Sequence, residues 1–246
     1  MIIALLSDIH SNLDALDACL THASENGADR YAFLGDIVGY GADPQGTVDK
    51  IRSYVPSGAI VVKGNHDDAV ETHARYMNDA AKDSIDWTRK TLSPESKAFL
   101  SSLPLVLHEG LMCFVHASAA SPERWDYVDA PNAARSSADA AKATYTFSGH
   151  VHEQMLYFEI SAGKWSAFQP TPGSPIPISS RRRWLALVGS VGQPRDGNPS
   201  AAYTLFDPVS EQITFHRVIY DHLAAARKIR QAGLPELHAY RLERGA

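Results

Sequence analysis

Five short apolar segments of this chain are each followed, within a few residues, by side chains that can bind a metal ion. A short apolar run bounded by turn residues is typical of a buried strand. In sheets that alternate with helices, ligand sites lie at the carboxyl ends of the strands. The segments and their followers are Ile2–Leu6 with Asp8 and His10, Tyr31–Leu34 with Asp36, Ala59–Val62 with Asn65, Leu111–Val115 with His116, and Tyr145–Phe147 with His150 and His152. We therefore predict that the fold gathers these side chains at one edge of a sheet.

The order of the predicted elements indicates the fold class. Leucines at 13, 16 and 20 recur at helical spacing, and Asp43-Pro44 has the residues of a helix start. Residues 78–102 are also predicted to be helical, with a restart at Ser93-Pro94, whereas the second half of the chain is mainly strand. An α/β fold of two packed mixed β-sheets flanked by helices satisfies both halves. The 246 residues contain no convincing linker, so a single domain spanning residues 1–246 is expected.

Composition narrows the functional class. The formal net charge of −5 argues against a protein that coats nucleic acid, because such binding relies on many Lys and Arg residues. The apolar run Met1–Leu6 is too short for a signal peptide, and no later segment has the length of a membrane-spanning helix. Cys19 and Cys113 are predicted to be small buried hydrophobic residues. These features favour a cytoplasmic protein.

The spacing within the motifs suits metal binding. In an extended segment, residues two apart point to the same side, so Asp8 and His10 are expected to reach one ion together. His150 and His152 have the same spacing and reach either one ion or two. The glycines at 35, 64 and 149 are expected to let the chain turn sharply before a ligand. Each motif alone is weak, and most single occurrences are capping, turn or core residues, but their joint occurrence after five strands favours a metal site.

The motifs Asp-x-His, Gly-Asp, Gly-Asn-His-Asp, a single His and Gly-His-x-His occur in this order from Asp8 to His152. In this the chain resembles the calcineurin-like metallophosphoesterases. The stretch Gly189–Pro199 is also similar to a loop of compact bacterial members, so the resemblance covers essentially the whole chain. It implies an αββα sandwich, with two sheets face to face, and a dinuclear metal site at the strand ends.

The resemblance also implies roles for individual residues. One metal would be held by Asp8, His10, Asp36 and His152, and the other by Asp36, Asn65, His116 and His150, with Asp36 bridging. Imidazole, carboxylate and amide ligands without thiolate suit two divalent transition-metal ions, Mn first, with Fe, Zn, Co or Ni as alternatives. The expected reaction is the hydrolysis of a phosphate ester by a metal-bridged hydroxide. His66, beside a ligand but not itself an expected ligand, is the candidate general acid.

Two departures from the family pattern narrow the substrate. Gly39 stands where relatives that are protein phosphatases carry the acidic partner of the catalytic histidine, and Tyr40 stands where they carry a phosphate-binding arginine. A phosphodiesterase or a phosphatase for small organic phosphates therefore fits better than a protein phosphatase. The alternatives are a nuclease or dinucleotide polyphosphate hydrolase of the same fold, or a non-catalytic metal-binding module. The expected partner is a small phosphorylated substrate rather than a membrane or nucleic acid, and the oligomeric state stays open.

Substrate contacts are harder to predict. Arg195 in the Gly-rich loop and Tyr40 are candidates, against the alternatives of a surface arginine and a packed aromatic residue. Trp125 is a further candidate for stacking on a base. Arg181–Arg183 form either a basic rim or, preferably, a solvated charge run.

Overall fold

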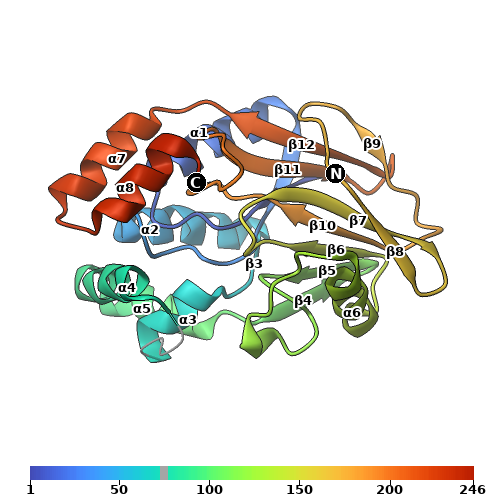
Figure 1. Ribbon diagram of the computed structural model, residues 1–246, viewed down its shortest axis with the longest axis horizontal. Helices are drawn as coiled ribbons and strands as arrows, with labels where there is room; N and C mark the ends of the chain where they lie inside the picture. The colour runs from blue at the N-terminus through green and yellow to red at the C-terminus, as the bar shows by residue number, and fades with distance from the viewer. Residues whose placement is uncertain (73–76) are drawn as a thin grey trace.

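Two six-stranded sheets pack face to face in the computed structural model, which describes residues 1–72 and 77–246 (Figure 1). The first sheet has the order β3 (Ile60–Val61), β2 (Ala28–Phe33), β1 (Ile2–Leu6), β11 (Ala201–Asp207), β12 (Gln212–Val218) and β9 (Ile176–Pro177). The second has the order β4 (Val106–Glu109), β5 (Met112–Val115), β6 (Tyr145–Ser148), β10 (Trp184–Val188), β7 (Gln154–Ser161) and β8 (Lys164–Phe168). Both sheets are mixed, because β1–β2–β3 and β5–β6–β10 are parallel while the other pairs are antiparallel. The predicted α/β fold class is confirmed.

Strand β1 explains why the first apolar run is continuous. Ile3 and Leu5 belong to the core between the two sheets, together with Phe114 and Phe147 of the second sheet. The alternate residues of the strand, Ala4 and Leu6, pack in a second core with helix α1 on the outer face. A strand covered on both faces needs apolar residues at every position rather than at alternate ones.

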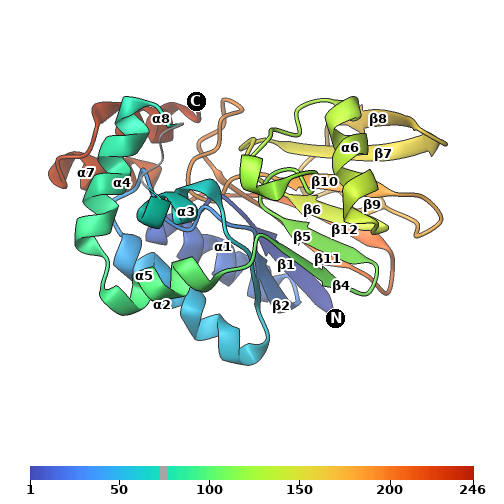
Figure 2. The same cartoon turned by 90° about the horizontal axis from the view of Figure 1, so that it is seen from below.

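Helices cover the outer faces of both sheets (Figures 1 and 2). Helices α1 (Leu13–Glu25), α2 (Pro44–Tyr54) and α5 (Pro94–Ser102) supply residues to the core outside the first sheet, and α6 (Pro131–Ala141) packs against β7, β8 and β10. The predicted helix starts at Asp43 and Ser93 are confirmed, because each side chain accepts a hydrogen bond from the backbone N–H three residues on. In the described part of the chain, none of the helices combines the length and apolarity needed to span a membrane.

The structure adds elements that were not predicted. One of them is α3 (Asn65–Thr72), which precedes α4 (Asp79–Thr91), a helix in the range where helices were predicted. At the other end, α7 (His222–Gln231) is followed beyond Gly233 by a second helix, α8 (Glu236–Arg244), which packs antiparallel to it in Figure 1. Cys19 and Cys113 are buried and unpaired, as expected.

Candidate functional site

The predicted metal-binding side chains meet at one edge of the two sheets. They come from the ends of β1, β2, β5 and β6 and from the first turn of α3. Each is at most 7% exposed. Asp8, His10 and His152 form one group able to hold a metal ion, and Asp36, His116 and His150 form another. All seven predicted residues are thus brought together, since Asn65 contacts His116.

Imidazole lone pairs converge in the first group. Nε2 of His10 lies 3.1 Å from Nε2 of His152, and the latter lies 3.3 Å from Oδ1 of Asp8. The opposite ring nitrogens, Nδ1 of His10 and Nδ1 of His152, contact the carbonyl oxygens of Val38 at 3.2 Å and Gln193 at 2.5 Å. Because a carbonyl only accepts, each Nδ1 carries the proton and each Nε2 presents a lone pair. A cation is the partner that this arrangement fits.

The second group repeats the pattern. His116 donates from Nδ1 to the carbonyl of Leu34 at 2.7 Å, so Nε2 is the atom that would bind a cation once it has lost its proton. That Nε2 lies 3.1 Å from Oδ1 of Asn65, 3.2 Å from Nδ1 of His150 and 3.4 Å from Oδ2 of Asp36. Amide oxygen, carboxylate and imidazole are all ligands for divalent transition metals.

Asp36 lies between the two groups. Its Oδ2 is 3.4 Å from Nε2 of His116 and 3.7 Å from Nε2 of His10, while Oδ1 accepts a hydrogen bond of 2.8 Å from the backbone N–H of His66. Oδ1 of Asp8 is buried without any hydrogen bond among the described residues. The site thus holds two buried carboxylates, and its unused acceptor atoms fit positive ions.

The ionisation of the site supports the same conclusion. Burial lowers the pKa of His10 and of His152 well below the ordinary value, so both rings are neutral. Burial also disfavours a charged His116, but the carboxylates of Asp36 and Asp8 outweigh it and raise the pKa of His116 to about 9. A proton on His116 therefore supplies, without metal, part of the positive charge that a bound cation would bring.

The backbone at the site differs from the expected extended conformation. Asp8 and His10 have φ of +52° and +49°, and Asp36, His150 and His152 are also in the left-handed region. Asp8 and His10 do converge, as predicted. The prediction assumed an extended segment, and that assumption was wrong, because the chain turns in a left-handed conformation at both residues. Asp and His tolerate this region better than most residues, although each such position costs about 1–3 kcal/mol.

The glycines before the ligands act in two ways. Gly35 has φ of +85° and allows the predicted turn. Gly149 does not have positive φ; a Cβ there would overlap Oγ of Ser7 and lie 2.5 Å from Oδ2 of Asp8. Glycine is therefore required at position 149 because the ends of two strands approach closely there. The prediction that it allows a sharp turn was wrong at this position.

His66 lies in the first turn of α3, directly beside both groups. Its ring is 4.4 Å from that of Tyr40 and 4.8 Å from that of His10. A Cβ on Gly39 would overlap Nδ1 of His66, so Gly39 does occupy the place next to this nitrogen. Nδ1 has no hydrogen-bond partner among the described residues, and burial lowers the pKa of His66 to about 4. His66 also forms a third possible metal-binding group with His10 and Asp36.

Tyr40 and Arg195 both lie beside the site. Tyr40 is 7% exposed, and its ring packs 4.4 Å from that of His10. The guanidinium of Arg195 lies over the Tyr40 ring at 5.8 Å and donates to Oε1 of Gln193 at 3.1 Å. Arg183, in contrast, is at the opposite end of β10 and pairs with Glu159 and Asp139, which agrees with a surface charge run.

A cleft of about 250 Å³ opens over the site, and it is lined both by Trp125, a candidate from the sequence, and by Tyr127, which the sequence did not single out. Tyr127, which is 53% exposed, stacks on His150 with ring centres 4.2 Å apart. Trp125 is 9% exposed and meets His116 edge to face. Nothing in the local sequence marks Tyr127, because its role depends on where the loop after β5 lies in space. The cleft is lined by Tyr40, Asn65, Met77, Asn78, Ala81, Arg124, Trp125, Tyr127 and His150.

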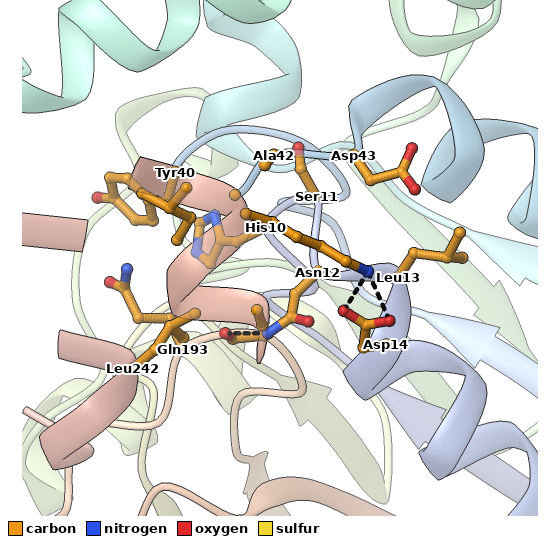
Figure 3. A pocket seen from close by; sticks show the side chains of 15 residues that line it. His10, Ser11, Asn12, Leu13, Asp14, Tyr40, Ala42, Asp43, Gln193 and Leu242 are labelled. Carbon is orange, nitrogen blue, oxygen red and sulfur yellow. Dashed lines mark hydrogen bonds and ion pairs between the residues drawn. The ribbon is translucent and has the colours of Figure 1, made fainter. Parts of the chain in front are cut away.

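A smaller cavity lies behind His10, between the loops of the site and the C-terminal helices (Figure 3). Its volume is about 20 Å³, room for about one water molecule. Asn12 borders it and donates to the carbonyl of Gly192, and Lys228 of α7 pairs with Asp14. This cavity is too small for a substrate, so the cleft is the better candidate for substrate binding.

Comparison with known protein sequences identifies a family whose members are phosphoesterases. The sequence profile of the calcineurin-like phosphoesterase superfamily domain matches residues 1–210. The chain is 36% identical over 253 residues to the uncharacterized protein MJ0912 of Methanocaldococcus jannaschii, with 98% of this chain and 96% of that protein covered.

Two solved structures of other proteins are similar to this structure over the whole chain. A metallophosphoesterase from Sphaerobacter thermophilus superposes with a TM-score of 0.89 at 36% identity, covering 100% of this chain and 99% of that one. The hypothetical protein PH1004 from Pyrococcus horikoshii OT3 has a TM-score of 0.79 at 20% identity, covering 100% and 98%, which concerns the fold alone. Because the profile covers most of the chain and the relatives at 36% identity nearly all of it, the protein belongs to the calcineurin-like phosphoesterase superfamily.

Proposed function

We propose that the protein is a metal-dependent phosphoesterase that hydrolyses phosphodiesters or small organic phosphates with a metal-bridged hydroxide. The observation that carries this proposal is the pair of converging ligand groups with Asp36 between them. Two groups that share one carboxylate are what a dinuclear site requires.

The metal ligands follow from the two groups. Asp8, His10, Asp36 and His152 would hold one ion, and Asp36, Asn65, His116 and His150 the other. Two divalent transition-metal ions fit this donor set, and we propose Mn first, with Fe, Zn, Co or Ni as alternatives. The chemistry that two such ions supply is a hydroxide nucleophile at neutral pH and compensation of charge on the phosphate oxygens.

The chain itself orients the ligands and handles the proton of the leaving group. Val38, Gln193 and Leu34 fix three imidazole rings through their carbonyls. His66 is within reach of the same space, and we propose that it donates a hydrogen bond to the phosphate or a proton to the leaving oxygen. Because Gly39 leaves Nδ1 of His66 without a carboxylate partner, no acidic group would stabilise its charged form from that side.

The surroundings favour a small substrate. The cleft volume of about 250 Å³ suits a compact phosphate ester, and we propose as substrate contacts Tyr40, which lines the cleft, and Arg195, which lies over the Tyr40 ring. The net charge of −5 disfavours long nucleic acid as a partner. We further propose that residues 1–246 act as one domain, since α7 and α8 pack beside the site, and that the protein works in the cytoplasm, where two unpaired cysteines stay reduced.

Hydrolysis of bis(p-nitrophenyl) phosphate, measured beside p-nitrophenyl phosphate, tests the proposal. The protein would be stripped with a chelator and resupplied separately with Mn, Ni, Co or Zn. Metal-dependent cleavage of the diester supports a phosphodiesterase, and cleavage of the monoester alone supports a phosphatase. Absence of turnover with two ions bound would refute the proposed enzymatic activity. The remaining interpretation would be a non-catalytic metal-binding module. Degradation of single-stranded DNA would instead favour a nuclease.

His66→Ala separates the proposed acid from the ligands. We expect this variant to keep its metal, measured by elemental analysis, and to lose about 10²-fold or more in turnover, the usual contribution of a general acid. Loss of metal would contradict the assignment and favour the third group, in which His66 is a ligand.

A further inference from the structure

Tyr127 places an exposed aromatic ring against a predicted metal ligand. Its ring stacks on that of His150, with ring centres 4.2 Å apart and an angle of 21° between the planes. His150 is 7% exposed, whereas Tyr127 is 53% exposed. Because one face of the Tyr127 ring covers His150, the accessible surface of the ring is its opposite face and its edges. Tyr127 lines the cleft over the site, so this accessible surface borders the space where a substrate would lie.

The residues on either side hold Tyr127 in this position. Trp125, two residues before it, is 9% exposed and meets the ring of His116 edge to face, with ring centres 6.0 Å apart. Val128, the next residue, is 1% exposed and packs in a core cluster with Leu185 of β10. Two buried side chains thus flank the exposed tyrosine, and the loop between β5 and α6 presents its ring to the cleft.

The backbone of this loop has an uncommon conformation. Trp125 has φ of +57° and Ser121 has φ of +59°, both in the left-handed region. That region is rare for a residue as bulky as tryptophan. Such positions persist only where the surrounding structure holds them, and they cluster at sites that bind ligands. Here the burial of Trp125 against His116 holds the loop, so the ring of Tyr127 is placed before any substrate binds.

The chemistry of the cleft favours a planar, apolar group. Three of its lining residues, Tyr40, Met77 and Ala81, belong to one packed cluster and are at most 8% exposed. Among the described residues that line the cleft, Arg124 alone carries a permanent charge, and Oδ2 of Asp126 lies 3.4 Å from its Nε. A second charged group of a substrate would therefore find its partner already compensated. An accessible aromatic face instead binds another ring, by offset stacking or by edge-to-face contact.

We infer that Tyr127 is a specificity-determining residue that stacks on a planar ring in the organic group of the substrate. The inference rests on the proposed function, which it deepens by naming the substrate class: phosphate esters whose organic group carries an aromatic or heteroaromatic ring. The phosphate would lie at the metal-binding groups, and the ring would lie on Tyr127 beside His150. The cleft of about 250 Å³ is smaller than most pockets for drug-sized ligands, and it suits a compact ring.

Benzyl phosphate and cyclohexylmethyl phosphate test the inference, because they differ in the planarity of one ring and contain no other aromatic group. Each would be assayed as the monoester and as its methyl diester, with metal in excess, and the ratio of the kcat/KM values determined. We expect the wild type to prefer the benzyl ester. Tyr127→Leu, which removes the ring but keeps an apolar side chain, should reduce this preference by about threefold to tenfold, the contribution of one aromatic pair.

Two control variants separate stacking from other roles of Tyr127. Tyr127→Phe keeps the ring and should keep the wild-type ratio. Tyr240→Leu removes a tyrosine of α8 that is 50% exposed and does not line the cleft, so it should also keep the ratio. An equal loss on both esters in Tyr127→Leu would overturn the inference, since it would show that Tyr127 only holds His150 in place. An unchanged ratio in Tyr127→Leu would overturn it as well.

Binding measurements keep this test independent of turnover. Benzylphosphonate and cyclohexylmethylphosphonate contain a P–C bond in place of the ester bond, and calorimetric titration of the metal-loaded protein reports the same preference without hydrolysis. Tighter binding of benzylphosphonate that Tyr127→Leu abolishes, in a protein without hydrolytic activity, would support the aromatic contact while the proposed function fails. Equal affinities for the two phosphonates, or binding of neither, would refute the inference.

Discussion

Asp67 holds together two loops that carry predicted metal ligands. It is 1% exposed and lies in the first turn of α3. Its Oδ1 accepts hydrogen bonds from the backbone N–H groups of Ile37 at 2.9 Å and Val38 at 3.2 Å, and its Oδ2 accepts one from Gly64 at 2.9 Å. The first two amides follow Asp36 and the third precedes Asn65. A change at Asp67 should therefore affect both stability and the site.

The substitution Asp67→Asn replaces one of the two carboxylate oxygens by an NH₂ group, which cannot accept a hydrogen bond. The amide oxygen can keep the two bonds to residues 37 and 38, while the NH₂ group then faces the N–H of Gly64. A buried donor left without an acceptor costs about 1–3 kcal/mol, and the remaining bonds weaken because the acceptor loses its charge. We expect a total loss of about 2–4 kcal/mol, which is about 4–16 °C in Tm for a chain of this size.

Thermal unfolding in chelator measures this loss. Burial and then the neighbouring Asp36 raise the pKa of Asp67 to about 7. The unfolding should be measured at about pH 8, where Asp67 of the wild type is mainly ionised. At lower pH a protonated Asp67 would resemble the variant, and the difference in stability would shrink. Repeating it with added Mn²⁺ should show a weaker stabilisation by metal than in the wild type.

Asp68→Asn is the control. The carboxylate of Asp68 lies 3.9 Å from Nζ of Lys63 and accepts a bond from Thr72 in a partly exposed setting, so its loss should cost about 1 kcal/mol or less. Equal melting temperatures for Asp67→Asn and Asp68→Asn would refute the argument that three buried backbone amides depend on Asp67.

Two further perturbations address the metal-binding groups themselves. Chelation of the wild type should lower Tm reversibly, since a metal present at about 100 times its Kd stabilises the fold by about 2.7 kcal/mol, and an unchanged Tm would contradict metal binding. Gly149→Ala should lower both stability, by about 1–3 kcal/mol, and metal content, because its Cβ would overlap Ser7 and crowd Asp8. Gly110→Ala, where nothing lies within 4 Å of the added Cβ, should keep the metal; equal metal loss in the two variants would contradict the role of close approach at Gly149.

The strands and the identity of the site residues could be predicted because they depend on local patterns. β1 is buried on both faces, which produces an uninterrupted apolar run in the sequence. Helix starts at Asp43 and Ser93 follow from the hydrogen bond that each side chain accepts. Since polar residues directly follow such strands, their meeting at one edge follows from the topology of the sheets.

What could not be predicted depends on contacts between distant parts of the chain. Tyr127 lies in a loop whose sequence has no motif, yet it stacks on His150. His238 lies in a helix without a recognisable motif, yet its ring packs against that of Tyr40. The need for glycine at position 149 arises from Ser7 and Asp8, some 140 residues away in the sequence. Contacts between residues that are far apart in the sequence produce no local sequence pattern from which they could be predicted.

Hydrogen bonds to the backbone orient three of the four predicted histidine ligands. His116, His10 and His152 each bind a backbone carbonyl through Nδ1, at Leu34, Val38 and Gln193 respectively. Those carbonyls follow β2 or β10, so the three rings are fixed by segments that follow strands of the two sheets. Within residues 1–72 and 77–246, no backbone carbonyl anchors the ring of His150; its backbone N–H binds Asp8 and its ring stacks on Tyr127.

This difference leaves the ring of His150 less constrained than the rings of His10, His116 and His152. The rings of His10 and His152 are held by hydrogen bonds to carbonyls, and burial lowers their pKa values, so their neutral rings keep lone pairs facing inward. A ring held mainly by stacking can turn away from its group when no cation is present. Exchange of metal should therefore begin at the Asn65, His116 and His150 group, on the side of the molecule where the cleft opens to solvent.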